Sequence, residues 1–225
     1  MKAALLVGAA ALAALAVQLL DRQPARGGVE AKTTGEGKTM IGNPSCGTSP
    51  GHVGHGTPLV PSGKNQLAIF AQGCFWGVEE RFRKVPGVVA TAVGYTGGHA
   101  KDPSYEAVCT HGTGHAEAVL VEFDPERVSY DELLTFFWQT HDPTSGDRQG
   151  PDRGSQYRSA IFTFDPGQMA KAVAARAEVQ KRLADSITTE IAPAGQFWVA
   201  EGYHQQWDEK HGALSCPAPH RARSK

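Results

Sequence analysis

The sequence lacks a charge excess, an internal repeat and the paired cysteines of a zinc site. It has 22 Lys and Arg residues against 23 Asp and Glu residues, which leaves a formal net charge of -1. No global field therefore attracts nucleic acid or an acidic membrane surface, and we expect no nucleic-acid partner. Cys109, His111 and His115 lie close together in sequence, but no Cys-x-x-Cys pair accompanies them, so we predict no metal site.

The composition suits one packed domain with extensions at its ends. The 225 residues include 40% hydrophobic and 20% charged residues, which is enough apolar material for a core. The four cysteines are Cys46, Cys74, Cys109 and Cys216, and their spacing alone does not choose among the possible disulfide pairings. Structural disulfides are favoured in an exported protein, although the surroundings of Cys74 indicate a different use for that residue.

The N-terminal residues differ in kind from the rest. Lys2 precedes an apolar run over residues 3–20, and Asp21 follows it, which is typical of an export signal. Ala14-Leu15-Ala16 offers a cleavage site with small residues, while an uncleaved membrane anchor is an equal alternative because the run is almost long enough to cross a thin bilayer. Both alternatives for residues 1–20 predict an exported protein, either periplasmic, secreted or anchored to the outer face of the inner membrane.

The remaining chain divides by composition. Residues 21–65 are rich in Gly, Thr, Ser and Pro and show no helical or strand period, so we predict a flexible linker that carries Cys46. A compact domain is predicted over residues 66–207. Residues 208–225 have little periodicity and are predicted to form a loose, mobile C-terminal tail that carries Cys216.

Apolar periodicity within residues 66–207 predicts the order of the elements. Strands are expected at 67–71, 88–95, 115–123 and 156–164, with helices at 75–82, 130–137 and 165–184 and a further strand near 188–192. The order β-α-β-β-α-β with an extra helix is typical of an α+β fold of the ferredoxin-like type, an antiparallel sheet with helices on one face. Ser129 and Glu132 are expected to form a capping box.

Cys74 lies within Gly73-Cys74-Phe75-Trp76-Gly77, at a predicted strand-to-helix junction. The free N–H groups and the dipole of the first helical turn stabilise a thiolate there. Phe75 and Trp76 would form an apolar wall beside the sulfur, which suits a nucleophile that grips a small apolar group. Periodicity alone equally allows a buried core cysteine surrounded by core aromatic residues.

Glu117 shares one strand face with Val119, Val121 and Phe123, because neighbours along a strand alternate. A carboxylate on an apolar face is costly unless it is protonated or paired. Burial would raise the pKa of the Glu117 carboxyl group and allow it to donate a proton. A buried ion pair, with Arg158 as the partner, is the competing interpretation.

Two tyrosines and one aspartate lie where they could reach the same site. Tyr105 is expected in the loop after Gly97-Gly98, and Tyr157 at the start of a strand. A phenol donates a hydrogen bond to a developing oxyanion without adding charge. Asp152, in a glycine-rich loop, could orient a substrate amide. The competing interpretations are half-buried packing for the tyrosines and a turn role for Asp152.

Seven separated motifs follow one another along the chain: Gly73–Gly77, Gly94–Gly98, Thr113–Glu117, His141–Pro143, Gln156–Ser159, Thr188–Ile191 and His204–Gln206. Together they resemble the A-type peptide methionine sulfoxide reductases. The resemblance covers about residues 66–216 and is highly specific, because independent motifs occur in the same order. It implies that residues 66–207 form the catalytic domain.

The resemblance implies a role for each candidate residue. It implies that Cys74 is the nucleophile that becomes a sulfenic acid and that Glu117 is the acid that protonates the departing oxygen. Tyr105 and Tyr157 would donate hydrogen bonds to that oxygen. Phe75 and Trp76 would form a pocket for the substrate methyl group, and Asp152 would be a substrate-orienting carboxylate. The family reduces the S epimer of methionine sulfoxide, in proteins and as the free amino acid, and uses no metal or bound organic cofactor. We expect a monomer, and contact with a membrane only through an uncleaved N-terminal segment.

The sulfenic acid must be resolved by a second thiol, and we expect Cys216 to do this because it lies on the predicted mobile tail, which could swing to Cys74. Many family members carry two cysteines in a glycine-rich tail, whereas this tail has one, so a thioredoxin or thioredoxin-like reductant is expected to attack the Cys74–Cys216 disulfide directly. Cys46 is an alternative relay thiol or an unrelated linker thiol, and Cys109, in a strand-like run, is expected to be structural. Outside the cytoplasm the reductant would be a thioredoxin-like membrane relay.

Two other functions compete with reduction. A cysteine acyl-transferase or hydrolase would need His115 or His204 within hydrogen-bond reach of the Cys74 sulfur. A non-enzymatic binding domain stabilised by disulfides would have all its thiols paired. Either alternative would leave the separated motifs unexplained.

Overall fold

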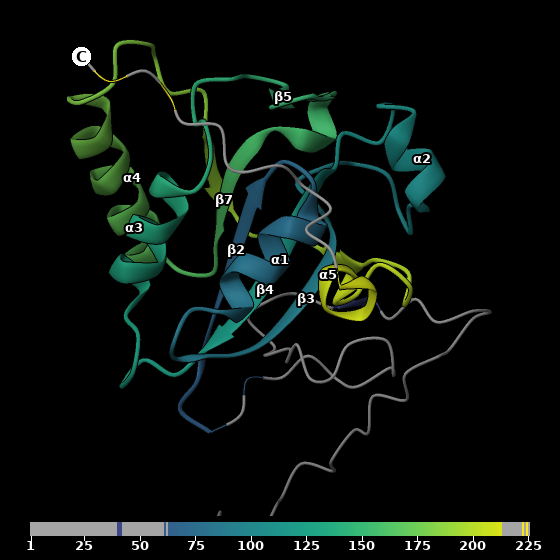
Figure 1. Cartoon of the computed structure of the whole chain (residues 1–225), viewed down its shortest axis with the longest axis horizontal. Helices are drawn as coiled ribbons and strands as arrows, with labels where there is room; N and C mark the ends of the chain where they lie inside the picture. Colours follow the sequence, from purple (N-terminus) through teal and green to yellow (C-terminus); the bar gives the residue numbers. More distant parts are fainter. Residues whose placement is uncertain (1–39, 42–60, 62, 213–221, 223, 225) are drawn as a thin grey trace, which may run out of the picture. The chain divides into compact units, whose positions relative to one another are not determined.

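The computed structural model describes residues 40–41, 61, 63–212, 222 and 224 (Figure 1). The predicted export signal or anchor, most of the predicted linker, and Cys46 and Cys216 lie outside the described residues. In the part of the chain that is described, no helix is both long and apolar enough to cross a membrane.

The described elements agree with the main predicted segments and add several short ones. The helices are α1 (Phe75–Arg83), α2 (Tyr105–Cys109), α3 (Tyr130–Gln139), α4 (Pro166–Gln180) and α5 (Trp207–His211). The strands are β1 (Met40–Ile41), β2 (Gln66–Gln72), β3 (Val88–Thr96), β4 (Ala116–Phe123), β5 (Arg148–Gln149), β6 (Asp152–Arg153), β7 (Ser159–Thr163), β8 (Glu190–Pro193) and β9 (Phe197–Val199). A 3-10 helix, η2 (Ser155–Tyr157), precedes β7.

The main sheet is mixed, in the order β1-β9-β3-β4-β2-β7-β8, and β5 and β6 form a separate hairpin. Every pair in the main sheet is antiparallel except β7 and β8. The α+β class is therefore confirmed, but the prediction of an antiparallel sheet is wrong at this edge. Helix α4 makes the crossover that two parallel strands require. The finer ferredoxin-like assignment stays a prediction.

The strand alternation places a hydrophobic cluster on each face of the sheet. The first cluster combines strand residues with α1, α3 and α4; within it the Phe70 ring stacks on that of Phe82 with centroids 4.9 Å apart. Figure 1 shows α1 across the strands and α3 beside α4. The second cluster consists of small and apolar strand residues such as Ala118 and Leu120. Helix α1 therefore packs against one face of the sheet, and it begins directly after Cys74.

Local signals fix the helix starts. The predicted capping box is confirmed, since the Glu132 amide donates to Ser129 Oγ over 3.2 Å and the Ser129 amide donates to Glu132 Oε2 over 2.8 Å. Asp165 caps α4 by accepting from the Gln168 amide over 2.9 Å. Residues 208–211, which we assigned to the tail, belong to α5.

Helix α5 is joined to α1 by polar contacts. Arg83 pairs with Glu209 over 2.6 Å. The Glu79 carboxyl group of α1 is buried and accepts from the Thr91 hydroxyl over 2.9 Å. It also accepts from the backbone amide of Gln206 over 2.7 Å and from its side-chain amide over 3.0 Å. Burial raises the pKa of Glu79, and these donors oppose that shift. Glu79 therefore holds Gln206, the N-cap residue of α5.

We predict that Glu79→Ala lowers the free energy of unfolding by about 3 kcal/mol, because it leaves buried donors on Thr91 and Gln206 without an acceptor. Urea unfolding measures this loss. The neighbouring Glu80→Ala is the matched control: its partner Lys84 is exposed, so the loss should stay below about 0.5 kcal/mol. Equal losses in the two variants would contradict this account of Glu79.

Candidate active site

The loop between β2 and α1 presents Cys74. Gly73 has φ +93°, and a Cβ atom there would lie 2.6 Å from the Cβ of Gln149, so the tight turn requires glycine. Cys74 is half-buried and is the N-cap of α1, one residue before the first turn in which we predicted it. The free N–H groups at the start of α1 favour negative charge at this position.

The Glu117 carboxyl group reaches the first residue of α1. Its Oε2 accepts a hydrogen bond from the Phe75 backbone amide over 3.1 Å, and Glu117 is 2% exposed. The carboxyl group therefore lies next to the residue that follows Cys74 in the chain. This contact joins the predicted nucleophile and the predicted acid, which are far apart in sequence.

The strand pattern explains why Glu117 is buried. Val119, Val121 and Phe123 belong to the hydrophobic cluster under α1, which agrees with the predicted alternation along β4. The competing ion pair with Arg158 gains no support, because Arg158 Nε donates to Glu190 Oε2 over 2.9 Å.

Tyr105 and Tyr157 both lie close to Glu117. Tyr105 begins α2, where Ser104 caps the helix. Tyr157 belongs to η2 rather than to the predicted strand, because Gly154, at φ +130°, starts a turn and β7 begins only at Ser159. Burial raises the pKa of both phenols, and Glu117, when it is ionised, adds to the shift. Both phenols are therefore neutral hydrogen-bond donors at neutral pH.

Asp152 lies on β6, on the same side of the site as Tyr157. The hairpin of β5 and β6 pairs Gln149 with Asp152, and Gln149 lies against Gly73. Burial raises the pKa of Asp152, and its charge in turn raises the pKa of Tyr157. The hairpin thus brings a partly buried carboxyl group to the edge of the site, and the substrate-orienting role of Asp152 stays a prediction.

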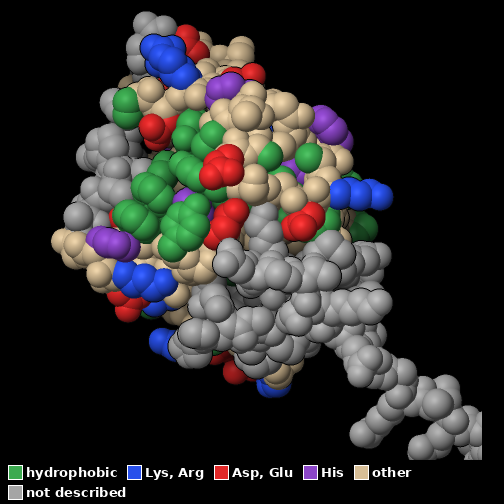
Figure 2. All heavy atoms as spheres, turned by 90° about the vertical axis from the view of Figure 1, so that its right-hand side faces the viewer, with side chains coloured by type: hydrophobic (Ala, Val, Ile, Leu, Met, Phe, Trp, Pro, Cys, Tyr) green, Lys and Arg blue, Asp and Glu red, His purple; other side chains and the backbone are tan. Residues whose placement is uncertain are grey.

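Phe75 and Trp76 form part of an aromatic wall. The ring of Phe75 is buried, and that of Trp76 stacks on Trp207 of α5 with centroids 4.4 Å apart and planes 13° apart. The His204 ring lies 5.1 Å from Phe75 and 4.5 Å from Tyr105. Figure 2 views the side where α2 and α5 lie and shows hydrophobic side chains gathered there with Asp and Glu at the edge.

Sequence reasoning missed Cys109 as a neighbour of this site. Cys109 ends helix α2, so its predicted strand is wrong, and its thiol is hydrogen-bonded to the Tyr105 hydroxyl group one helical turn away. Burial raises the pKa of the Cys109 thiol, the hydrogen bond with Tyr105 opposes the shift, and Glu117, when it is ionised, adds to it. The spacing of four residues could have indicated that Tyr105 and Cys109 share a helix face.

Sequence reasoning also missed Glu201 as a structural partner. Its carboxyl group accepts from the Tyr95 hydroxyl over 3.0 Å and from the Tyr105 backbone amide over 3.0 Å. It thereby ties the start of α2 to the sheet. No local sequence signal predicts this, because Glu201 lies about a hundred residues from both partners.

The two histidines of the acyl-transfer alternative are engaged elsewhere. His115 Nδ1 accepts from the Gly98 amide over 3.1 Å, and its Nε2 is 2.7 Å from the Ala100 carbonyl oxygen. His204 Nδ1 accepts from the Trp76 indole over 2.9 Å. Neither arrangement favours a cysteine–histidine nucleophile pair.

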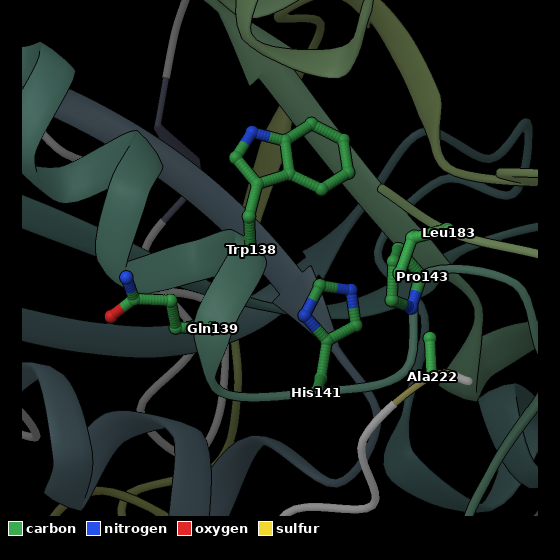
Figure 3. Close-up of a pocket in the computed structure, with 6 residues that line it drawn as sticks. All are labelled: Trp138, Gln139, His141, Pro143, Leu183 and Ala222. Atoms are coloured by element: carbon green, nitrogen blue, oxygen red, sulfur yellow. The ribbon is translucent and has the colours of Figure 1, made fainter. Parts of the chain in front are cut away.

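A separate cavity of about 320 Å³ contains none of the predicted site residues (Figure 3). Its lining residues are Trp138, Gln139, His141, Pro143, Leu183 and Ala222. Burial lowers the pKa of His141 to about 4, and its Nε2 lies 2.7 Å from Ser159 Oγ, so this imidazole is neutral and hydrogen-bonded within the core. Within residues 63–212, no group of three or more His, Cys, Asp or Glu side chains could hold a metal ion.

Comparisons with known proteins agree on one family. The family model described as peptide methionine sulfoxide reductase matches residues 66–225. The chain is 60% identical to the peptide methionine sulfoxide reductase MsrA of Methanosarcina mazei over 151 residues, which are 66% of this chain and 72% of that protein. It is 50% identical to the MsrA of Streptomyces griseus over 184 residues, covering 79% of this chain and 78% of that protein.

Comparison with solved structures indicates the same family. Methionine sulfoxide reductase A of Corynebacterium diphtheriae is 41% identical, with a TM-score of 0.64, and the match covers 68% of this chain and 78% of that chain. Mxr1 from Saccharomyces cerevisiae in its reduced form is 36% identical, with a TM-score of 0.67, and the match covers 71% of this chain and 93% of that chain. Together with the family model, these matches place the described fold in one family.

We predict that Glu117→Gln slows the single-turnover reduction of a methionine sulfoxide peptide by about 10²- to 10⁴-fold, because an amide cannot act as a general acid. The glutamine oxygen can still accept from the Phe75 amide, so the melting temperature and substrate affinity should hardly change. A lower melting temperature with an unchanged rate per folded molecule would instead assign Glu117 a structural role.

Proposed function

Because the chain belongs to the A-type peptide methionine sulfoxide reductase family, we propose that it reduces the S epimer of methionine sulfoxide, in proteins and as the free amino acid, to methionine. The observation that carries the proposal is the hydrogen bond from the Phe75 amide to Glu117. It places a buried carboxyl group beside a half-buried cysteine at a helix N-cap. A nucleophile and a proton donor are the two groups that the reaction needs.

The first step transfers oxygen from substrate to Cys74. The Cys74 sulfur attacks the sulfoxide sulfur while Glu117 protonates the oxygen, which is a poor leaving group until it is protonated. The resulting hydroxyl group passes to the Cys74 sulfur as the new S–S bond breaks and its electron pair stays on the substrate sulfur. The sulfoxide is reduced to the thioether, and the thiol is oxidised to a sulfenic acid. Neutral Tyr105 and Tyr157 donate hydrogen bonds to the oxygen as charge develops on it.

Binding uses apolar and polar contacts. Phe75 and Trp76 enclose the substrate methyl group, and Asp152 orients the backbone amide. Support for the first contact comes from the aromatic wall at the site, and for the second from the hairpin that brings Asp152 next to Tyr157. An apolar pocket with few placed polar groups suits a small thioether-like side chain.

Two further thiol reactions return Cys74 to its reduced form. Cys216 attacks the sulfenic sulfur, releases water and forms a Cys74–Cys216 disulfide, which a thioredoxin-like dithiol protein reduces. The chain acts as a monomer. If the apolar segment over residues 1–20 directs export, the reductant is a thioredoxin-like relay at the membrane. These steps rest on the sequence and on thiol chemistry.

We expect the wild-type protein with dithiothreitol to reduce the separated S epimer of a methionine sulfoxide peptide and to leave the R epimer intact. Cys74→Ser should abolish reduction, because a hydroxyl group is a far weaker nucleophile at neutral pH. The matched control Cys46→Ser, in the predicted linker, should keep the wild-type rate. Reduction that persists in Cys74→Ser would show that another residue is the nucleophile.

A further inference from the structure

His204 lies in a turn whose next two residues are bonded into the core. The turn connects β9 with α5. The Gln205 side chain accepts from the Val93 amide and donates to the Val93 carbonyl oxygen, both over 2.8 Å. The Gln206 amide donates to the buried Glu79 carboxyl group over 2.7 Å. The backbone of His204 is therefore fixed relative to β3 and α1.

The side chain of His204 is 1% exposed and is bonded to the aromatic wall. Its Nδ1 lies 2.9 Å from Trp76 Nε1. An indole nitrogen only donates, so His204 Nδ1 must be unprotonated and act as the acceptor. Burial lowers the pKa of His204 to about 4, and the nearby Glu201 carboxylate opposes the shift. The imidazole is therefore neutral at neutral pH, with its proton on Nε2.

Trp76 is consequently held from two directions. His204 binds the edge of the indole through Nε1, and Trp207 covers one face. A stacked face alone allows the indole to slide or turn in its plane, whereas a hydrogen bond at the edge fixes its direction. Together the two contacts leave one orientation of the Trp76 ring beside Cys74.

We propose that His204 is a positioning residue, which fixes the Trp76 indole and thereby sets the shape of the apolar pocket next to Cys74. The inference rests on the proposed function, since the pocket is taken to hold the substrate methyl group. The hydrogen bond of His204 goes to Trp76, while its ring also packs against Phe75 and Tyr105, so the test must separate the hydrogen bond from the packing. The methyl group occupies the pocket in both the ground state and the transition state, so a displaced indole should raise KM more than it lowers kcat.

Two complementary substitutions separate the hydrogen bond from the packing. His204→Phe keeps an aromatic ring of similar size and loses the acceptor. His204→Asn loses the ring and keeps an acceptor near the position of Nδ1. We expect His204→Phe to raise KM for the S epimer about tenfold with kcat changed less than about threefold, and His204→Asn to restore most of the wild-type KM.

A double-variant cycle tests whether the effect passes through Trp76. Trp76→Phe removes the indole donor, so adding His204→Phe to it should raise KM no further. His211→Phe is the matched control: the His211 ring stacks on Trp207, 3.8 Å between centroids, and its Nδ1 lies 2.8 Å from the Trp207 carbonyl oxygen rather than next to Trp76. KM should be unchanged in this control.

The indole N–H signal of Trp76 in a ¹⁵N-labelled sample reports the bond without any turnover, and Trp76→Phe identifies the signal. We expect the chemical shift of this N–H to change in His204→Phe and to stay the same in His211→Phe. The proposal is overturned if the signal does not move, if His204→Phe only lowers the melting temperature, or if the effects of His204→Phe and Trp76→Phe on KM multiply. A wild-type protein that reduces neither epimer would contradict the proposed function, and the indole signal would still decide the His204–Trp76 bond.

Discussion

The hydrogen bond from the Phe75 amide to the Glu117 carboxyl group joins the start of α1 to the sheet. It satisfies one of the N–H groups that a helix leaves unpaired at its first turn, and it gives a buried carboxyl group a donor inside an apolar layer. Because Cys74 is the N-cap of the same helix, the contact also sets where the sulfur lies relative to the carboxyl group. The remaining site residues are arranged around this pair.

Separate hydrogen bonds hold the surrounding residues next to Cys74 and Glu117. Glu201 ties the start of α2 to the sheet, and so places Tyr105. Glu79 ties α5 to α1, and so places Trp207 against Trp76. Each of these groups is a carboxyl group that accepts hydrogen bonds; Glu79 is buried and Glu201 is partly buried, and a carboxyl group removed from water costs free energy unless its hydrogen-bond partners are complete. Two buried glutamates, Glu79 and Glu117, and the partly buried Glu201 therefore hold the site together.

The sequence predicted the features that depend on local patterns. The α+β class, the helix that follows Cys74, the capping box at Ser129 and the buried face of Glu117 all follow from periodicity and capping rules. These signals extend over a few residues, and tertiary contacts in the described structure agree with them.

The features that sequence reasoning missed depend on distant partners. Helix α2 has five residues, too few to be stable alone, and is held by Glu201 across 96 positions. The parallel pairing of β7 and β8 depends on how α4 crosses the sheet, which periodicity does not specify. The part that His204 plays depends on Trp76, 128 residues earlier. Cys216 lies outside the described residues, so its pairing stays a prediction.

The most direct test of the account is a single turnover without reductant, in which the S epimer of a methionine sulfoxide peptide is mixed with the fully reduced protein and free thiols are counted before and after. The account predicts about one methionine per chain and the loss of one pair of thiols, because Cys74 takes the oxygen and a second thiol then closes a disulfide. No methionine and an unchanged thiol count would contradict it.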